Sequence, residues 1–114
     1  MKFNIRIVKK EDKSALLELV KKLAEYERKK PEEVQLTLDK IKLHGFGKEK
    51  YFDVLIAEYN ETSIGYALYF FSYSASSGAP ILYIEDLFVE NEYRHQGLGK
   101  ALLSSLAKIA IQKE

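Results

Sequence analysis

The sequence predicts an α+β fold, in which helices pack on both sides of a mostly antiparallel sheet (an α-β-α arrangement) and the elements follow the order β-α-α-β-β-β-α. First, 114 residues, 46% of them hydrophobic and 31% charged, are typical of one globular domain. Second, apolar residues recur at helical spacing near the start of the chain and over residues 98–112. Third, three aromatic-rich and β-branched-rich runs lie between them. We therefore expect a single domain over residues 1–114.

The first element is expected to be a strand, because apolar and polar residues alternate over residues 3–8. Asp12 or Ser14 can cap the helix that follows. The expected inner face of the strand consists of Phe3, Ile5 and Ile7, and the apolar stripe of the helix of Leu16, Leu19, Val20 and Leu23.

Glu27 continues the apolar stripe of this first helix, because it stands 11 residues after Leu16. That position places a carboxylate at the inner edge of the helix end. The alternative is a frayed terminus with Glu27 in solvent. The helix is expected to end before Pro31, whose ring would clash inside a helix.

A second, short helix is predicted from Thr37, which should cap it, through residues 40–43. Residues 44–47, His-Gly-Phe-Gly, are then expected to form a loop. Gly45 is assigned to the position just after the helix, where glycine commonly ends helices.

The second half of the chain is predicted to contain three strands and a closing helix. The strands are expected over residues 51–59, 63–73 and 80–89, with a tight hairpin at 60–62 and a longer connection at 74–78. The aromatic run 66–73 contains no Arg or Lys, so we favour core and interface side chains over a platform for stacking nucleobases. A third interpretation has Tyr66, Phe70 and Tyr73 lining a substrate channel.

Composition excludes several classes of protein. The chain contains no cysteine and only two separate histidines, His44 and His95, which disfavours disulfides, a thiol nucleophile and a metal centre. A net charge of +1 argues against nucleic-acid binding, although residues 1–50 carry 14 basic and 9 acidic groups against 4 and 8 in residues 51–114. Solvated helix faces are the simpler explanation of that imbalance. No apolar stretch approaches the roughly 18 residues that span a bilayer, so we expect no membrane partner and a cytoplasmic protein.

The segment 82–101 is predicted to run from a strand through a glycine-bearing turn into a helix. Backbone N–H groups and the positive end of the helix dipole converge at such a turn, which suits an anion. Gly97 and Gly99 would allow phosphate oxygens to approach the main chain, with Arg94 and Lys100 at the rim. A Walker loop is excluded by Arg94 and Ala101, and a dinucleotide fingerprint by the absence of the third glycine. A turn that merely enters a helix is the structural alternative.

The remaining pattern, Arg94-x-x-Gly97-x-Gly99, resembles the pyrophosphate turn of the GNAT superfamily of N-acetyltransferases. Five further segments resemble the diamine (spermidine/spermine) N-acetyltransferases of that superfamily: residues 5–6, 23–27, 44–47, 65–70 and 82–89. The resemblance covers essentially the whole chain and implies the acyl-CoA N-acyltransferase fold.

The resemblance implies acetyl-CoA or coenzyme A as the cofactor. Main-chain groups of Leu87 and Val89 would then meet the pantetheine arm, and N–H groups of the turn would surround the pyrophosphate. The predicted cofactor-binding residues are Leu87, Phe88, Val89, Arg94, His95, Gln96, Gly97, Leu98, Gly99 and Lys100.

The resemblance also implies a small-molecule amine substrate. Tyr26, Glu27, Glu85 and Asp86 are the expected substrate-binding residues, and Glu85 is the expected catalytic residue. An amine with a pKa of about 10 is protonated at neutral pH and must lose a proton before it attacks. Neighbouring strand residues face opposite sides, so Glu85 and Asp86 share a site only if the strand bulges, as it does in the family. Otherwise they are polar ends of a half-exposed strand.

Members of the family continue beyond the helix at which this chain stops, into a C-terminal part that holds the tyrosine resembling a general acid. We therefore expect a C-terminally truncated domain with little transferase activity, and a homodimer or higher homo-oligomer that covers the exposed strand 82–89. The alternative function is a non-catalytic coenzyme A binding or dimerisation module. Nucleic-acid binding through the basic first half is a third hypothesis.

Overall fold

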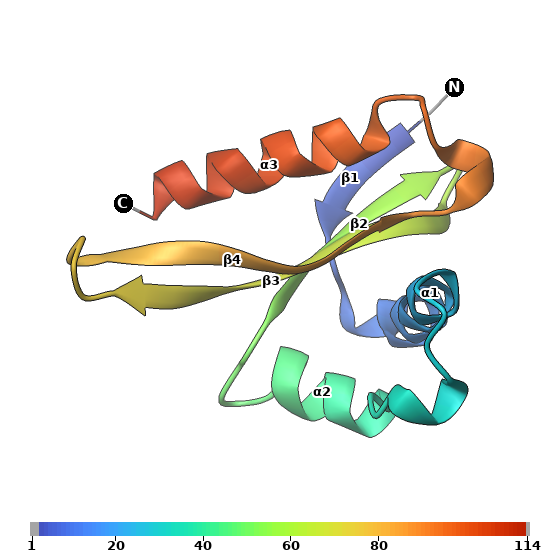
Figure 1. The fold of residues 1–114 in the computed structure, drawn as a ribbon, viewed down its shortest axis with the longest axis horizontal. Coiled ribbons are helices and arrows are strands. Elements are labelled where there is room, and N and C mark those ends of the chain that lie inside the picture. The colour runs from blue at the N-terminus through green and yellow to red at the C-terminus, as the bar shows by residue number, and fades with distance from the viewer. Residues whose placement is uncertain (1–2, 114) are drawn as a thin grey trace.

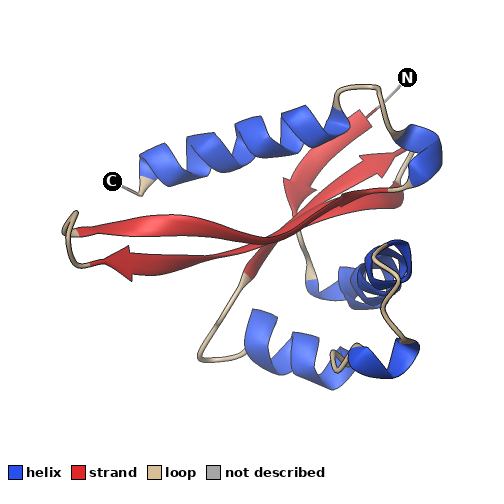
Figure 2. Cartoon of the chain, in the orientation of Figure 1, coloured by secondary structure: helices blue, strands red, loops and turns tan. Residues whose placement is uncertain are grey.

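The computed structural model describes residues 3–113, so Met1, Lys2 and Glu114 of the predicted domain lie outside the described residues. A four-stranded antiparallel sheet has the order β1-β2-β3-β4. Helix α3 covers one face, and α1 and α2 lie on the other (Figures 1 and 2). The strands are β1 (Phe3–Ile7), β2 (Asp53–Tyr59), β3 (Thr62–Ser74) and β4 (Ala79–Val89), and the helices are α1 (Lys13–Tyr26), α2 (Leu38–Phe46) and α3 (Leu98–Gln112). The predicted fold class and element order are confirmed.

Each face of the sheet has its own apolar core. Leu102 and Leu106 of α3 pack with Leu55 and Ala67 of the sheet. The α1 and α2 side contains four large side chains that are fully buried: Leu16, Ile41, Ile56 and Tyr66. Alternating strand residues thus serve both cores, which explains why the sheet strands are apolar on both faces.

The hairpins follow the predicted turn chemistry. Asn60 and Glu61 both have positive φ, 47° and 67°, as a tight two-residue hairpin requires. The longer β3–β4 hairpin turns at residues 75–78 and extends alongside α3 (Figure 1). Among the described strands β4 pairs only with β3, so it lies at the edge of the sheet.

Strand β4 bulges where the family resemblance implies. Leu68 lies opposite Asp86, but the next residue of β3, Tyr69, lies opposite Ile84. Glu85 is therefore an extra residue without a partner in the ladder. The bulge lets Glu85 and Asp86 face the same side of the sheet, and the prediction of a bulge is confirmed.

Three local predictions need correction. Ile7 is 67% exposed, because the core under α3 takes in Phe3 and Ile5 but not Ile7. Residues 44–46 are helical rather than a loop, and α2 ends at Phe46, with Gly47 as the extended residue that follows. Gly45 is buried inside the helix because the ring of Phe52 packs where a side chain would stand, with an ideal Cβ only 2.9 Å from the ring. Strand β2 begins at Asp53, two residues later than predicted.

Thr37 caps α2 as predicted, because its hydroxyl accepts a hydrogen bond from the Lys40 N–H at 3.1 Å. None of the helices described between residues 3 and 113 is long and apolar enough to cross a membrane.

Asp12 precedes α1, but its carboxylate does not cap the helix. It binds groups in β1 and in the connection between β1 and α1 instead. It accepts two hydrogen bonds from the Arg6 guanidinium, at 2.8 and 2.9 Å, and one from the Lys9 N–H at 2.6 Å. Arg6 also pairs with Glu58 of β2 at 3.2 Å. The Arg6 guanidinium and the Lys9 N–H hold the pKa of Asp12 below its usual value despite partial burial.

We predict that Asp12→Asn destabilises the fold by about 1 kcal/mol at pH 7, because charged hydrogen bonds to Arg6 are lost. The pKa of Asp12 is lower in the folded than in the unfolded chain, so this stability is present above about pH 4 and is lost as the pH falls through the folded-state pKa. Urea unfolding at several pH values tests this. Glu11→Gln, an exposed neighbour, is the control, and a difference between wild type and Asp12→Asn that persists undiminished at low pH would contradict the prediction.

Candidate functional site

The turn between β4 and α3 gathers backbone N–H groups that have no partner. After a short 3₁₀ segment (Asn91–Tyr93), His95 and Gly97 adopt positive φ values of 65° and 84°, and α3 begins at Leu98. Within residues 3–113, the backbone N–H groups of residues 95–100 donate no hydrogen bond, whereas the Ala101 N–H donates to the Gly97 carbonyl. Six consecutive N–H groups without a partner, at and just before a helix N-terminus, suit an anion.

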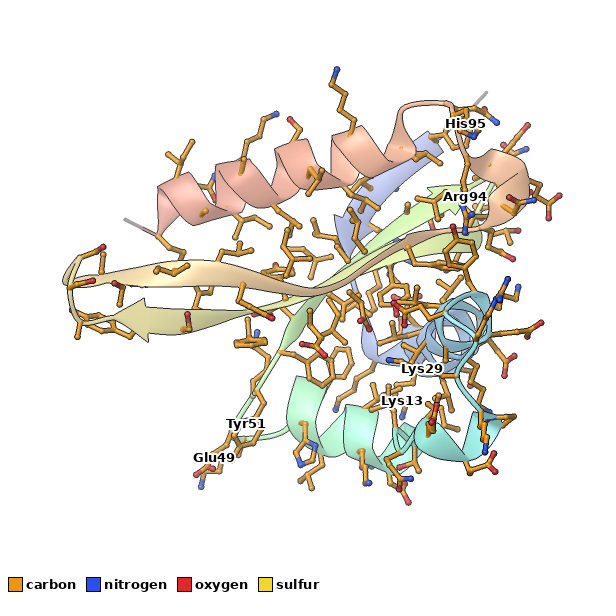
Figure 3. All side chains as sticks on the ribbon, viewed as in Figure 1. Lys13, Lys29, Glu49, Tyr51, Arg94 and His95 are labelled. Atoms are coloured by element: carbon orange, nitrogen blue, oxygen red, sulfur yellow. The ribbon has the colours of Figure 1, made fainter. Side chains whose placement is uncertain are left out.

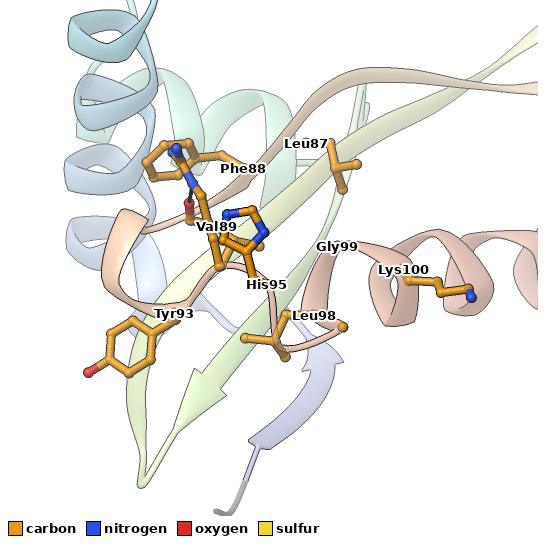
Figure 4. Close-up of a pocket in the computed structure, with 10 residues that line it drawn as sticks. Leu87, Phe88, Val89, Tyr93, His95, Leu98, Gly99 and Lys100 are labelled. Carbon is orange, nitrogen blue, oxygen red and sulfur yellow. Dashed lines mark hydrogen bonds between the residues drawn. The ribbon is translucent and has the colours of Figure 1, made fainter.

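A cavity of about 340 Å³ opens over this turn (Figure 4). Of the predicted cofactor-binding residues, all but Gln96 line it: Leu87, Phe88, Val89, Arg94, His95, Gly97, Leu98, Gly99 and Lys100. Tyr93 also lines it, and its ring packs edge-on against Tyr59 with centroids 5.5 Å apart. The prediction missed Tyr93, although an aromatic residue directly before Arg94 was the available signal.

The two glycines of the turn present bare backbone to open space. An ideal Cβ on Gly97 or Gly99 would meet no other atom within 4 Å. At Gly97 the positive φ explains the residue type, because other L-residues are strained there. At Gly99, which is helical, no such backbone demand exists. The missing side chain keeps the first turn of α3 open beside the cavity.

Arg94 is fixed in place by the protein itself. Its Nε donates to the Val89 carbonyl at 2.8 Å, which ties the turn back to the end of β4. Its guanidinium carbon lies 4.4 Å from the centroid of the Tyr26 ring and 5.6 Å from that of Phe88. The Arg94 guanidinium therefore lies between the end of α1 and the turn of residues 95–100, which we call the anion turn.

A smaller cavity of about 160 Å³ lies between the end of α1, the Pro31–Glu33 turn and the β4 bulge. Four carboxylates line it: Glu27, Glu33, Glu85 and Asp86. Lys29, labelled in Figure 3, also lines it, with its Nζ 3.3 Å from Glu27 Oε1. Excess negative charge makes this cavity suited to a cationic group.

The structure therefore brings Glu27, Glu85 and Asp86 together, whereas Tyr26 does not line the acidic cavity and lies beside Arg94. Glu27 is solvated, as the frayed-terminus alternative had it, yet still faces the cavity. Glu33 was not predicted, because its position depends on how the Pro31 turn folds back.

The carboxylate of Asp86 accepts a hydrogen bond from a buried tyrosine. The Tyr66 hydroxyl donates to Asp86 Oδ2 at 2.9 Å, and Tyr66 is fully buried. Burial raises the pKa of Asp86; the Tyr66 hydrogen bond opposes that rise, and the nearby Glu85 and Glu27 add to it. Burial likewise raises the pKa of Tyr66, so its hydroxyl keeps its proton and remains a donor. Tyr66 is a core residue, as favoured above, with one polar contact that the sequence did not indicate.

Comparison with known proteins matches residues 15–114 to the family described as "Acetyltransferase (GNAT) family". Thialysine N-epsilon-acetyltransferase of Bos taurus is 36% identical, over 96% of this chain and 68% of that protein. Spermidine/spermine N(1)-acetyltransferase-like protein 1 of Homo sapiens is 34% identical, over 96% of this chain and 16% of that protein.

Solved structures give the same fold. An aminoglycoside acetyltransferase, meta-AAC0020 from an uncultured soil metagenomic sample, in complex with sisomicin, aligns with a TM-score of 0.80 over 97% of this chain and 71% of its own. Its sequence identity is 19%, so this likeness concerns the fold alone.

The two glycines of the turn should differ in what alanine does to stability. Gly97→Ala should lower the free energy of unfolding by about 1 kcal/mol, because a Cβ disfavours positive φ. Gly99→Ala should leave it unchanged or raise it by up to about 1 kcal/mol, since alanine favours helix and meets no atom. Thermal and urea unfolding measure both, and equal losses in the two variants would contradict the turn geometry.

Proposed function

The chain belongs to the GNAT acetyltransferase family, and on this premise we propose that it is an N-acetyltransferase that moves an acetyl group from acetyl-CoA to a primary amine of a small polyamine-like or diamine-like substrate. The observation that carries the proposal is the row of free N–H groups of residues 95–100 beneath an open cavity. The acidic cavity, which Glu85 and Asp86 help to line, lies on the other side of the same end of β4.

The residues at the turn fit the pyrophosphate of coenzyme A. Backbone N–H groups of residues 95–100 would hold the phosphate oxygens, and the open faces of Gly97 and Gly99 leave room for them. Leu87 and Val89 line the cavity from β4, where their main-chain groups would meet a pantetheine arm. When bound, acetyl-CoA supplies an acetyl group activated as a thioester. A backbone N–H near Leu87 would stabilise the negative charge that develops on its carbonyl oxygen.

The acidic cavity fits the other reactant. A primary amine with a pKa of about 10 is a cation at neutral pH, and Glu27, Glu85 and Asp86 face the cavity where it would bind. The names of two similar proteins refer to thialysine and to spermidine/spermine, which carry such amines. The amine must lose a proton before its nitrogen can attack, and these carboxylates are the acceptors within reach of the cavity.

Two expectations from the sequence stay predictions: the homo-oligomer and the cytoplasmic location. The exposed apolar side chains of Ile81 and Tyr83 on the edge strand β4 support self-association.

Coenzyme A binding tests the anion turn. Gly99→Leu should abolish the heat of binding in titration calorimetry, because the side chain would occupy the space over the N–H groups, while the fold persists. Ser104→Leu, on an exposed position of the same helix, is the matched control and should bind as the wild type does. Wild-type binding by Gly99→Leu would place coenzyme A elsewhere.

Glu27→Gln tests the acidic cavity. The variant should raise KM for diamines and polyamines about two- to fivefold, as expected for a partly solvated charge pair, with KM for acetyl-CoA unchanged. Glu18→Gln, at an exposed carboxylate of α1, should change neither KM. A wild-type chain that binds coenzyme A but acetylates no amine in the panel would instead identify a non-catalytic coenzyme A binding module.

A further inference from the structure

We infer that Lys22 and Tyr26, two residues of α1, are positioning residues for the anion turn. They hold Arg94 and the residues that lead into the turn, although neither lines the cavity over it. The inference rests on the proposed function and deepens it, because it names two residues outside the turn that set its affinity for coenzyme A. Tyr26, which the sequence assigned to the amine site, thereby receives a different role.

Side chains of α1 contact the residues on both sides of the short 3₁₀ segment that precedes the anion turn. Lys22 and Tyr26 are one helical turn apart and therefore lie on the same side of α1. The Lys22 Nζ lies 2.6 Å from Oε1 of Glu90, the residue before the segment. The centroid of the Tyr26 ring lies 4.4 Å from the guanidinium carbon of Arg94, the residue after it. All four residues line one groove of about 390 Å³, so α1 is joined at two points to the chain that enters the turn.

Burial in a core does not explain the tyrosine at position 26. Tyr26 is 66% exposed, and neither apolar core of the described residues includes it. Its ring contacts the Arg94 guanidinium instead, and a cation is attracted to the electron-rich face of an aromatic ring. The ring of Phe88 lies 5.6 Å from the same guanidinium carbon. The position of the Arg94 side chain is therefore set from α1 as well as from β4.

The contacts that hold Arg94 leave charged donors for a ligand. Its Nε donates to the Val89 carbonyl at 2.8 Å, whereas Nη1 and Nη2 donate no hydrogen bond within residues 3–113. A guanidinium presents such nitrogens as a planar fork that matches two oxygens of a phosphate. Arg94 lines the cavity over the anion turn, so a phosphate bound there would meet this fork beside the backbone N–H groups.

The ion pair between Lys22 and Glu90 also changes the charge near the turn. Glu90 carries a carboxylate that is only 18% exposed and stands shortly before the anion turn, where a negative charge opposes a phosphate. The carboxylate accepts a hydrogen bond from the Lys22 Nζ, which raises the pKa of Lys22 above its ordinary value, so the ammonium group stays charged. Lys22 thereby neutralises Glu90 while it joins α1 to the residue that follows β4.

Consecutive residues at the end of α1 serve the two cavities. Tyr26 contacts Arg94, whereas Glu27, the next residue, lines the acidic cavity, which Tyr26 does not line. Loss of the Tyr26 ring should therefore weaken binding of coenzyme A and leave binding of the amine unchanged. This difference separates the positioning role from the amine-binding role that the sequence predicts.

Tyr26→Leu tests the ring contact. It should raise the Kd for coenzyme A in titration calorimetry about threefold to tenfold, because the attraction between cation and ring is lost. Tyr26→Phe keeps the ring and should restore wild-type binding. Tyr51→Leu, which removes a similarly exposed tyrosine between α2 and β2, is the matched control (Figure 3). An unchanged Kd in Tyr26→Leu, or a rise in the KM for the amine alone, would overturn the inference.

A double-mutant cycle shows whether Tyr26 acts through Arg94. Arg94→Leu should weaken binding of coenzyme A, and the addition of Tyr26→Leu should then weaken it no further, because the ring has lost its partner. If Tyr26→Leu weakens binding by the same factor with and without the guanidinium, the two residues act independently and Tyr26 has no positioning role.

Lys22→Met tests the ion pair. It should raise the Kd for coenzyme A about twofold to fivefold, the effect of a largely solvated ion pair. Lys21→Met removes the same charge from an exposed neighbour that forms no salt bridge among the described residues, and it should bind as the wild type does. Equal losses in the two variants would reflect net charge and overturn the role of Lys22. These outcomes leave the acetyltransferase function standing, whereas a wild-type chain that binds no coenzyme A overturns both.

Discussion

One extra residue in β4, the bulge at Glu85, determines which side chains of this strand line each of the two cavities. The register shift between Leu68 and Tyr69 leaves Glu85 outside the ladder, and that single insertion turns Glu85 and Asp86 toward α1 together. Leu87 and Val89 then resume the opposite face and line the cavity over the anion turn. Without the bulge, one carboxylate would point into the core under α3. Asp86 therefore lines the acidic cavity and the next residue, Leu87, lines the cavity over residues 95–100, because the strand is irregular at that point.

The two cavities share strand β4 but differ in the source of their electrostatic field. Residues 51–114 carry 4 basic and 8 acidic groups, so no broad positive field draws an anion to the turn. The backbone N–H groups of residues 95–100, which have no partner within the described residues, are the local dipoles that suit an anion there. The acidic cavity depends instead on clustered side-chain charge, which suits a small cation. Two cavities that suit opposite charges thus lie at the same end of β4.

Much of this arrangement follows from residue patterns. The element order, the positive-φ hairpin at Asn60 and Glu61, the Thr37 cap and the glycine turn each depend on short-range rules that a sequence displays. The predictions were wrong or incomplete where contacts between residues far apart in the sequence determine the structure. Gly45 lies inside α2, where the Phe52 ring leaves no room for a side chain, and Ile7 is exposed because the core under α3 does not extend to it. The Tyr66–Asp86 hydrogen bond joins residues 20 apart across two strands, and Glu33 reaches the cavity only through the fold of the Pro31 turn.

The stacking of Arg94 on Tyr26 has a thermodynamic consequence for whatever binds at the turn. A long side chain normally loses conformational entropy when a ligand immobilises it, which weakens binding. Arg94 has lost most of that freedom when the chain folds, because the Val89 carbonyl and the Tyr26 ring already hold it. The cost of ordering is thereby moved from the binding equilibrium to the folding equilibrium. Tyr26 of α1 would thus contribute to the affinity for a ligand at the turn through its contact with Arg94.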